Sequence, residues 1–184
     1  NADGMSIVWA ARFLGYEIKE RVAGIDLMDN LVGLAHKKKY KCFFLGAKNH
    51  VVKKIVDHYS DMYSNQVIAG YRNGYFDNNE EKILVDQIIK SKANLLFVAM
   101  TSPKKEIFLN KYKVKLKSVN LIMGVGGSFD VISGEVKRAP LFMQKIGLEW
   151  FYRLIQEPRR MWRRYLIDNI KFVILIIKSR FFKS

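Results

Sequence analysis

The stretch Asn94-Leu-Leu-Phe-Val-Ala-Met100 decides the fold class. Its apolar residues follow one another without alternating polar positions, which is typical of a strand covered on both faces in a parallel sheet. Pro103 follows shortly afterwards and suits the first turn of a helix, where an N–H would have no helical partner. The sequence around residue 100 therefore predicts a buried strand that leads directly into a helix.

Three more strand-like runs occur before and after this stretch. The segments between them carry apolar residues at helical spacing, as in residues 49–59, and Asp77 is placed to cap one of these helices. This alternation predicts an α/β, Rossmann-like fold with a largely parallel sheet and helices on both faces. Such sheets bind ligands at the carboxyl ends of their strands. The four predicted strands are Lys41–Gly46, Gln66–Gly70, Asn94–Met100 and Val119–Gly124.

The composition excludes several classes of protein. With 49% apolar residues among 184, the chain can bury enough surface to fold, which excludes intrinsic disorder. Its single cysteine, Cys42, excludes a disulfide scaffold and suits a reducing compartment. The chain begins at Asn1 with no initiator methionine and no signal pattern, so we expect it to start partway through a longer protein.

The net charge of +15 is concentrated near the C-terminus. Residues 136–184 hold 12 Lys or Arg against three acidic residues, which gives +9 of the total. Such a segment attracts an anionic membrane, a phosphorylated substrate or nucleic acid. The apolar run Phe172–Ile177, flanked by basic residues, is too short to span a bilayer and is typical of an interfacial helix. We therefore predict a Rossmann-like domain over residues 1–139 and a basic, membrane-associating helical appendage over residues 140–184.

Three patterns carry candidate chemistry, and each also fits an ordinary structural role. Gly124-Val-Gly-Gly-Ser-Phe-Asp130 follows a strand, so its glycines either let the backbone approach a phosphate or form a tight turn. Asp3 precedes a helix predicted over residues 6–13, where a carboxylate serves as a general base or as an N-cap. Arginines after Pro140 suit pyrophosphate oxygens or line a solvated helix face. The three histidines show no metal-ligand spacing.

These motifs together resemble those of the WecG/TagA/CpsF glycosyltransferases, glycosyltransferase family 26. The resemblance covers nearly the whole chain, and the matching stretches occur in family order. They are highly specific as a set, although several are weak singly. The stretches are Asp3-Gly4, Arg21–Leu27, Phe44–Gly46, Gly74–Phe76, Pro103–Glu106, Gly124–Asp130, Gly134, Lys137–Pro140, Leu148–Leu154 and Glu157-Pro158.

The resemblance implies an inverting enzyme with a C-terminal helical appendage and no obligatory metal or other cofactor. Members move a sugar from a UDP-sugar donor to a polyprenyl-diphosphate-linked sugar acceptor, peripherally on the cytoplasmic face of the bacterial membrane. The expected reaction is transfer of N-acetylmannosamine to lipid-linked N-acetylglucosamine, in the synthesis of wall teichoic acid, capsule or exopolysaccharide. The implied partners are therefore the donor, the acceptor and an anionic membrane surface, and not nucleic acid.

The resemblance also implies roles for individual residues. Asp3 resembles the candidate catalytic base, and Arg21 matches an active-site arginine. Three appendage arginines would close over the site and meet the diphosphate, neutralising the departing UDP in place of a metal. These arginines are Arg153, Arg160 and Arg163. The residues that would bind the nucleotide sugar are Gly46, Lys105, Glu106, Gly126, Gly127 and Asp130.

Two features depart from the family pattern. Lys105 stands where the family usually has glutamine, which adds a cation near the expected cleft. Relatives also carry an upstream segment that contributes to the active site, so we expect this chain to lack part of its first βα unit. An incomplete sheet is more prone to associate, and the body without its appendage would expose apolar surface. A homo-oligomer is therefore possible, and no pattern fixes its stoichiometry.

Two hypotheses remain beside the enzyme. The first is a catalytically inactive scaffold of a polysaccharide-assembly complex, which the expected loss of the upstream segment favours. The second is a nucleic-acid-binding protein, which the charge favours but which lacks a recognisable fold motif. A nucleic-acid-binding arm has no need of the apolar run Phe172–Ile177, so the sequence favours the membrane-associated transferase.

Overall fold

A computed structural model of the chain describes residues 4–18 and 21–181, and it gives the backbone but not the side chains of residues 160, 161 and 163–168. The chain forms two compact units. One is Gly24–Val136, and the other combines the residues up to Ala23 with those from Lys137 onward. The boundary predicted from the sequence was a single one, after residue 139. The division differs because the N-terminal helix groups with the C-terminal helices.

The unit Gly24–Val136 is built on a four-stranded parallel sheet, which confirms the predicted fold class. The strands lie in the order β2-β1-β3-β4, and each overlaps one of the four predicted runs. The central pair is in continuous register, from Cys42 opposite Leu95 to Gly46 opposite Ala99. The strands are β1 (Cys42–Gly46), β2 (Ile68–Arg72), β3 (Leu95–Ala99) and β4 (Leu121–Gly124).

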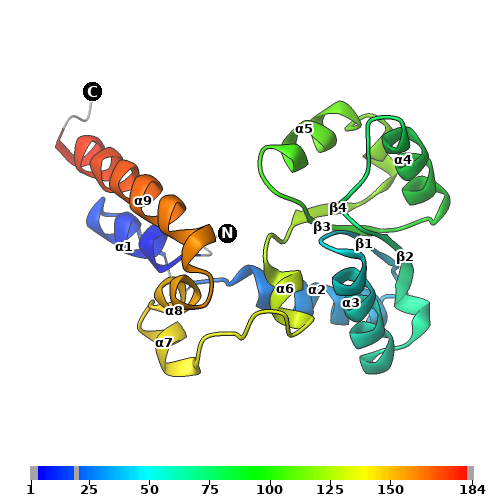
Figure 1. Cartoon of the computed structure of the whole chain (residues 1–184), viewed down its shortest axis with the longest axis horizontal. Helices are drawn as coiled ribbons and strands as arrows, with labels where there is room; N and C mark the ends of the chain where they lie inside the picture. The colour runs from blue at the N-terminus through cyan, green and yellow to red at the C-terminus, as the bar shows by residue number, and fades with distance from the viewer. Residues whose placement is uncertain (1–3, 19–20, 182–184) are drawn as a thin grey trace. The chain divides into compact units, whose positions relative to one another are not determined.

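Helices cover both faces of this sheet (Figure 1). Buried residues of two helices belong to one core cluster and those of three helices to the other, as expected of a sheet whose central strands are apolar throughout. The first pair is α4 (Glu80–Lys90) and α5 (Lys104–Lys111), and the other three are α2 (Gly24–Lys37), α3 (Asn49–Met62) and α6 (Ser128–Ile132). Short 3₁₀ turns, η1 (Asn65–Val67) and η2 (Lys115–Ser118), precede β2 and β4.

Alternation along the strands divides the core into two clusters. On the side of α2 and α3, Phe44 and Phe97 are fully buried, with ring centroids 5.6 Å apart. On the side of α4 and α5, Leu45 and Leu96 are fully buried. Burial of one such side chain contributes about 2 kcal/mol to stability. The two clusters therefore hold the central strands, and with them the loops that leave their carboxyl ends.

Asp77 has the helix-capping role that the sequence predicts. Its Oδ1 accepts hydrogen bonds from the N–H groups of Asn79 (2.8 Å) and Glu80 (2.9 Å). The Glu80 carboxylate in turn accepts a hydrogen bond from the N–H of Asp77 at 3.2 Å. This reciprocal arrangement is a capping box. It fixes the start of α4 and therefore the end of the loop that follows β2.

Cys42 provides a test of the core. The side chain is fully buried in β1, and this burial raises the pKa of the thiol from 9.0 to about 12. We expect no reaction with a thiol reagent at pH 8.5 in the native protein and complete reaction in urea, measured by absorbance. Because the thiolate is disfavoured only in the folded state, stability should fall as pH rises from 9 towards 12. Rapid labelling of the native protein would contradict the placement of Cys42.

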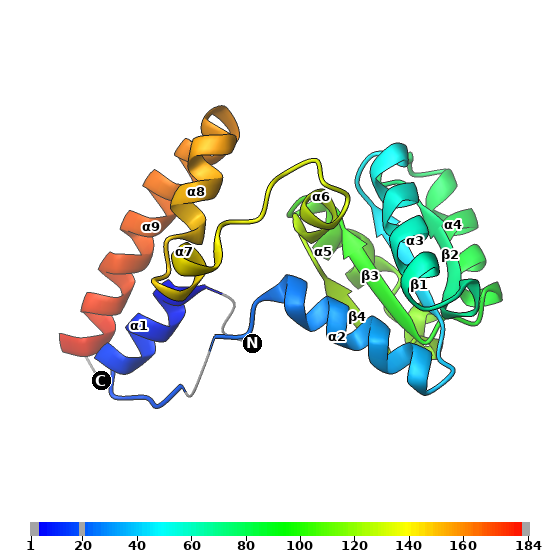
Figure 2. The ribbon, with the colours of Figure 1, turned by 90° about the horizontal axis from the view of Figure 1, so that it is seen from below.

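The described part of the second unit consists of helices. The expected helix over residues 6–13 is α1, and its Val8 is buried. The α1 helix runs alongside α9, where the Arg180 guanidinium lies 5.7 Å from the centroid of the Phe13 ring (Figure 2). A Cβ atom at Gly147 would lie 2.8 Å from Met5, so α1 also packs closely against the turn after α7. The helices are α1 (Met5–Phe13), α7 (Leu141–Lys145), α8 (Glu149–Gln156) and α9 (Pro158–Phe181).

Within the described residues, none of the helices combines the length and the apolar character needed to cross a membrane.

Candidate functional site

The carboxyl ends of the four strands meet at one edge of the sheet, because all the strands are parallel. All six residues expected to bind a nucleotide sugar lie at this edge, at the end of β1 or in the segments that follow β3 and β4. The structure therefore brings together residues that are far apart in the sequence. They are Gly46 at the end of β1, Lys105 and Glu106 in the first turn of α5, Gly126 and Gly127 after β4, and Asp130 in α6.

Gly46 is required by the geometry of this edge. Its φ is +129°, and a Cβ atom there would lie 2.3 Å from the carbonyl oxygen of Ala99. The same carbonyl accepts a hydrogen bond from the N–H of Ala47 at 2.9 Å, and the carbonyl of Ala47 accepts one from Gly74 at 2.9 Å. Three strand ends are thus tied together by backbone contacts that leave no room for a side chain at residue 46.

The loop after β4 combines a tight turn with open space. The N–H of Val125 donates to the carbonyl of Val98 at 3.0 Å, which ties the loop to β3. Gly126 has a φ of +53°, and no atom lies within 4 Å of the position that its Cβ would occupy. The loop thus forms a tight turn and also leaves room at Gly126 for a ligand such as a phosphate to come close to the backbone. The expected electrostatic help from a helix N-terminus is weak, however, because α6 has only five residues.

The first turn of α5 places a charged pair beside this loop. A Cβ atom at Gly124 would lie 3.1 Å from the Nζ atom of Lys105, so the lysine lies along the end of β4. The Lys105 Nζ is 3.1 Å from Oε1 of Glu106. A hydrogen bond from its own backbone N–H, followed by the contact with Lys105, holds the pKa of Glu106 below its usual range. Glu106 is therefore a carboxylate at neutral pH and accepts hydrogen bonds rather than donating a proton.

The residues assigned to catalysis and to the lipid diphosphate belong to the other unit. Asp3 lies outside the described residues. Arg21 forms an ion pair with Glu149, the first residue of α8, and both side chains are partly buried. On the same helix, the Nε atom of Arg153 lies 3.6 Å from the carboxylate of Glu157. Arg160 and Arg163 are in α9, but their side chains lie outside the description.

Several polar contacts were not foreseen from the sequence. Glu149 binds Arg21 across 128 positions, a separation that no local pattern reveals. The amide of Gln156 accepts a hydrogen bond from the N–H of Lys137 (3.0 Å) and donates one to its carbonyl (2.9 Å). Lys104 contacts the loop after β2, although within the stretch Pro103–Glu106 only Lys105 and Glu106 had been assigned a binding role. Each contact joins segments that are distant in the sequence, which is why none could be predicted.

No group of three or more His, Cys, Asp or Glu residues that could hold a metal ion forms among residues 4–18 and 21–181. The metal-independence of the reaction stays a prediction.

The family model described as "Glycosyl transferase WecG/TagA/CpsF family" matches residues 1–184. The chain belongs to this family. Membership of the WecG/TagA/CpsF family agrees with the resemblance carried by the motifs. It favours the glycosyltransferase over the nucleic-acid-binding hypothesis, because the matched residues include the strand-end loops described above.

Two curated proteins are similar to the chain over most of its length. A protein of Bacillus subtilis (strain 168) is 40% identical over 178 residues, which cover 96% of this chain and 67% of the relative. A protein of Bacillus spizizenii (strain W23) is 38% identical over 176 residues, covering 96% of this chain and 66% of the relative. Both are named N-acetylglucosaminyldiphosphoundecaprenol N-acetyl-beta-D-mannosaminyltransferase. The chain thus spans about two thirds of the length of these relatives.

Proposed function

We propose that this chain transfers N-acetylmannosamine from a UDP-sugar to N-acetylglucosamine carried on polyprenyl diphosphate. The observation that carries the proposal is the 40% identity, over 96% of the chain, to a relative named for this acceptor and this transferred sugar. The biological setting is the synthesis of a cell-surface polysaccharide such as wall teichoic acid. No cofactor is required in the proposal, since the UDP-sugar is itself a substrate.

The carboxyl edge of the sheet is the proposed donor site. Gly126 lies where a phosphate can come close to the backbone, because no atom lies within 4 Å of its Cβ position. Gly46 and Gly127 are proposed to line the same edge, at the end of β1 and before α6. Asp130 is proposed to accept hydrogen bonds from the ribose. Parallel α/β sheets hold nucleotides at this edge, which supports the assignment.

The proposed reaction is a single displacement. The acceptor hydroxyl oxygen attacks the anomeric carbon as Asp3 takes its proton, and the bond from that carbon to the UDP oxygen breaks with both electrons going to UDP. One displacement inverts the anomeric centre, so an α-linked donor gives a β-linked product. The word "beta" in the names of both relatives supports this outcome.

Arginines are proposed to stabilise the departing diphosphate. Arg153, Arg160 and Arg163 would meet the phosphates, and their fixed charge would offset the charge that develops on UDP. Arg21 belongs to the same proposed set, and its ion pair with Glu149 holds the guanidinium in one orientation. Cations at these positions would supply the neutralisation that a metal provides in other transferases.

The α9 helix is the proposed membrane contact, on the inner face of the bacterial cell membrane, where UDP-sugars are available. Four apolar side chains of α9 recur at the spacing of one helix face, and each is at least 47% exposed. Lys171 and Lys178 flank this stripe, as in helices that lie in a membrane interface. The four side chains are Ile170, Ile174, Ile177 and Phe181.

Replacing Lys171 and Lys178 together with glutamine should weaken binding to anionic vesicles about tenfold or more, since each basic residue near the surface contributes about 1 kcal/mol. The measurement is co-sedimentation with phosphatidylglycerol vesicles at low salt. Exposed lysines of the other unit provide the matched control, because Lys53→Gln with Lys82→Gln removes the same charge. Equal sedimentation of both double variants and the unchanged protein would contradict the membrane contact.

The donor assignment is tested by offering the enzyme UDP-N-acetylmannosamine or UDP-N-acetylglucosamine with the same lipid-linked acceptor. The proposal predicts product from the first donor only. Its β linkage would be seen in the one-bond carbon–proton NMR coupling at the new anomeric centre. Product from the second donor alone, or an α linkage, would contradict it.

A further inference from the structure

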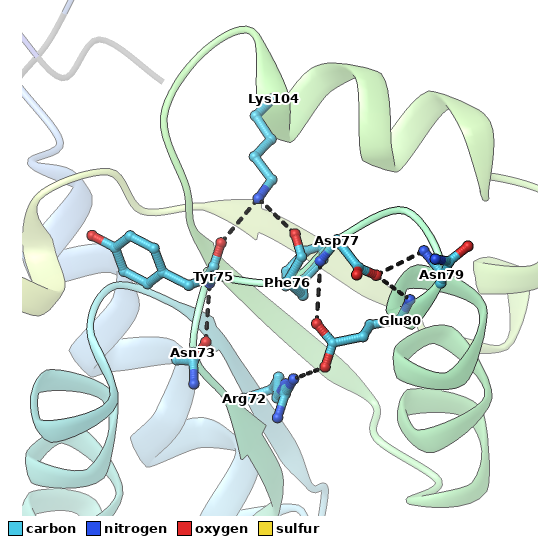
Figure 3. A network of polar contacts seen from close by, with 9 residues as sticks. Arg72, Asn73, Tyr75, Phe76, Asp77, Asn79, Glu80 and Lys104 are labelled. Atoms are coloured by element: carbon cyan, nitrogen blue, oxygen red, sulfur yellow. Dashed lines mark hydrogen bonds and ion pairs between the residues drawn. The ribbon is translucent and has the colours of Figure 1, made fainter.

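Lys104 connects the loop after β2 to the start of α5 at the proposed donor edge. Its Nζ atom donates hydrogen bonds to the carbonyl oxygens of Gly74 (3.1 Å) and Phe76 (3.4 Å). The same atom lies 4.4 Å from the centroid of the Phe76 ring, which is a cation–π contact. Figure 3 shows Lys104 reaching from α5 to the turn formed by residues 74–76. These three partners of the ammonium, two carbonyl oxygens and an aromatic ring, are all neutral groups.

The turn at residues 74–76 lies across the carboxyl end of β1. A Cβ atom at Gly74 would lie 3.2 Å from the Cα of Gly46, and the N–H of Gly74 donates to the carbonyl of Ala47 at 2.9 Å. Since Gly46 belongs to the proposed donor site, the position of this turn determines the shape of one side of that site.

Local contacts fix the two ends of the turn but do not join it to α5. On the β2 side, the side chain of Asn73 accepts a hydrogen bond from the N–H of Tyr75 at 3.0 Å. On the α4 side, the Asp77 capping box and the ion pair between Arg72 and Glu80 (2.7 Å) hold the chain. Tyr75, at the apex, is 69% exposed, and its ring points away from this network (Figure 3). Two side-chain contacts of the described residues join the turn to α5: the Phe76 ring packs on the Phe108 ring, with centroids 5.7 Å apart, and Lys104 supplies the polar link to the backbone of the turn.

We propose that Lys104 is a positioning residue for nucleotide binding: it holds the Gly74–Phe76 turn across the end of β1 and so keeps the UDP site in its binding geometry. The inference rests on the proposed function, because it takes UDP to be the ligand of this edge. A cation that donates to two carbonyls orders the turn before the ligand arrives, which lowers the entropy lost on binding.

The test compares UDP affinity by calorimetry in three variants. Lys104→Met removes both hydrogen bonds and should raise the Kd for UDP about tenfold. Lys104→Arg keeps the charge and the donors and should restore the Kd to within about threefold of the unchanged protein. The matched control is Lys111→Met, on the same helix, which removes a lysine bound to Glu81 at 2.6 Å, away from the strand ends, and should leave the Kd unchanged.

Hydrogen exchange at the Gly74 amide supplies a second readout that needs no ligand. Exchange should be faster in Lys104→Met than in the unchanged protein and normal in Lys111→Met. A normal Kd for UDP in Lys104→Met would overturn the inference. So would a raised Kd in Lys104→Met if Lys111→Met showed the same rise and Lys104→Arg did not restore the normal value. Failure of the unchanged protein to bind UDP would instead contradict the proposed function. If the unchanged protein does not bind UDP, hydrogen exchange still tests the role of Lys104 in holding the turn. Unaltered exchange at the Gly74 amide in Lys104→Met would then overturn that role as well.

Discussion

Replacing Asp3 with asparagine should lower the rate of sugar transfer about 10²–10⁴-fold, the range that a general base contributes. Asparagine has nearly the same size but cannot take the proton from the acceptor hydroxyl. UDP affinity should stay within about twofold, because Asp3 is proposed to contact the acceptor hydroxyl and not the nucleotide. The measurement is UDP release from saturating donor and acceptor, with the UDP Kd determined in parallel.

The matched control for this prediction is Asp61→Asn, at an exposed position of α3. It makes the same chemical change away from the proposed site and should keep full turnover. Normal turnover in Asp3→Asn would show that another group accepts the proton. The same experiment separates the enzyme from an inactive scaffold, since a scaffold would have no turnover to lose while its partner binding stayed intact.

Replacing Gly46 with alanine should lower the free energy of unfolding by about 3 kcal/mol or more. The added Cβ would lie 2.3 Å from the Ala99 carbonyl oxygen, and a φ of +129° is unfavourable for any residue with a side chain. Relief of the overlap requires the ends of β1 and β3 to move apart at their last paired residues. UDP binding should be lost with this movement. The measurement is urea unfolding followed by circular dichroism.

Gly134→Ala provides the comparison that separates backbone strain from overlap. Gly134 also has a positive φ, +79°, but no atom lies within 4 Å of its Cβ position. Its substitution should cost only about 1 kcal/mol, the usual penalty for a left-handed backbone. Equal losses in the two variants would mean that the contact between Gly46 and Ala99 does not determine the geometry of this edge.

The sheet could be predicted because its signals are local. The run Asn94–Met100 is apolar at every position from Leu95, and the structure covers β3 on both faces. Asp77 and Glu80 are three residues apart, so their capping box could also be anticipated in part. Such features depend on neighbouring residues, and a single sequence contains them in full.

Contacts between distant segments could not be predicted in the same way. The N-terminal residues up to Ala23 contact the C-terminal residues through the ion pair of Arg21 with Glu149 and the packing of Met5 near Gly147. The role of Lys104 depends on two carbonyls about 30 residues earlier, and a lysine beside a proline does not reveal which acceptors it will reach. The positions of the candidate site residues followed from the motifs, whereas the groups that hold them became visible only in three dimensions.

Acceptor-dependent release of UDP in detergent is the decisive measurement of the proposed sugar transfer. The substrates are UDP-N-acetylmannosamine and a short-chain polyprenyl-diphospho-N-acetylglucosamine. The assay uses this chain, and also the chain extended by the residues of the Bacillus subtilis relative that lie outside the match, because the match covers 67% of that protein. The proposed transfer predicts that UDP appears only when the acceptor is present. The amount of UDP released should equal the amount of disaccharide lipid formed. UDP release that is independent of the acceptor, or no release from the extended protein although it binds UDP, would contradict it.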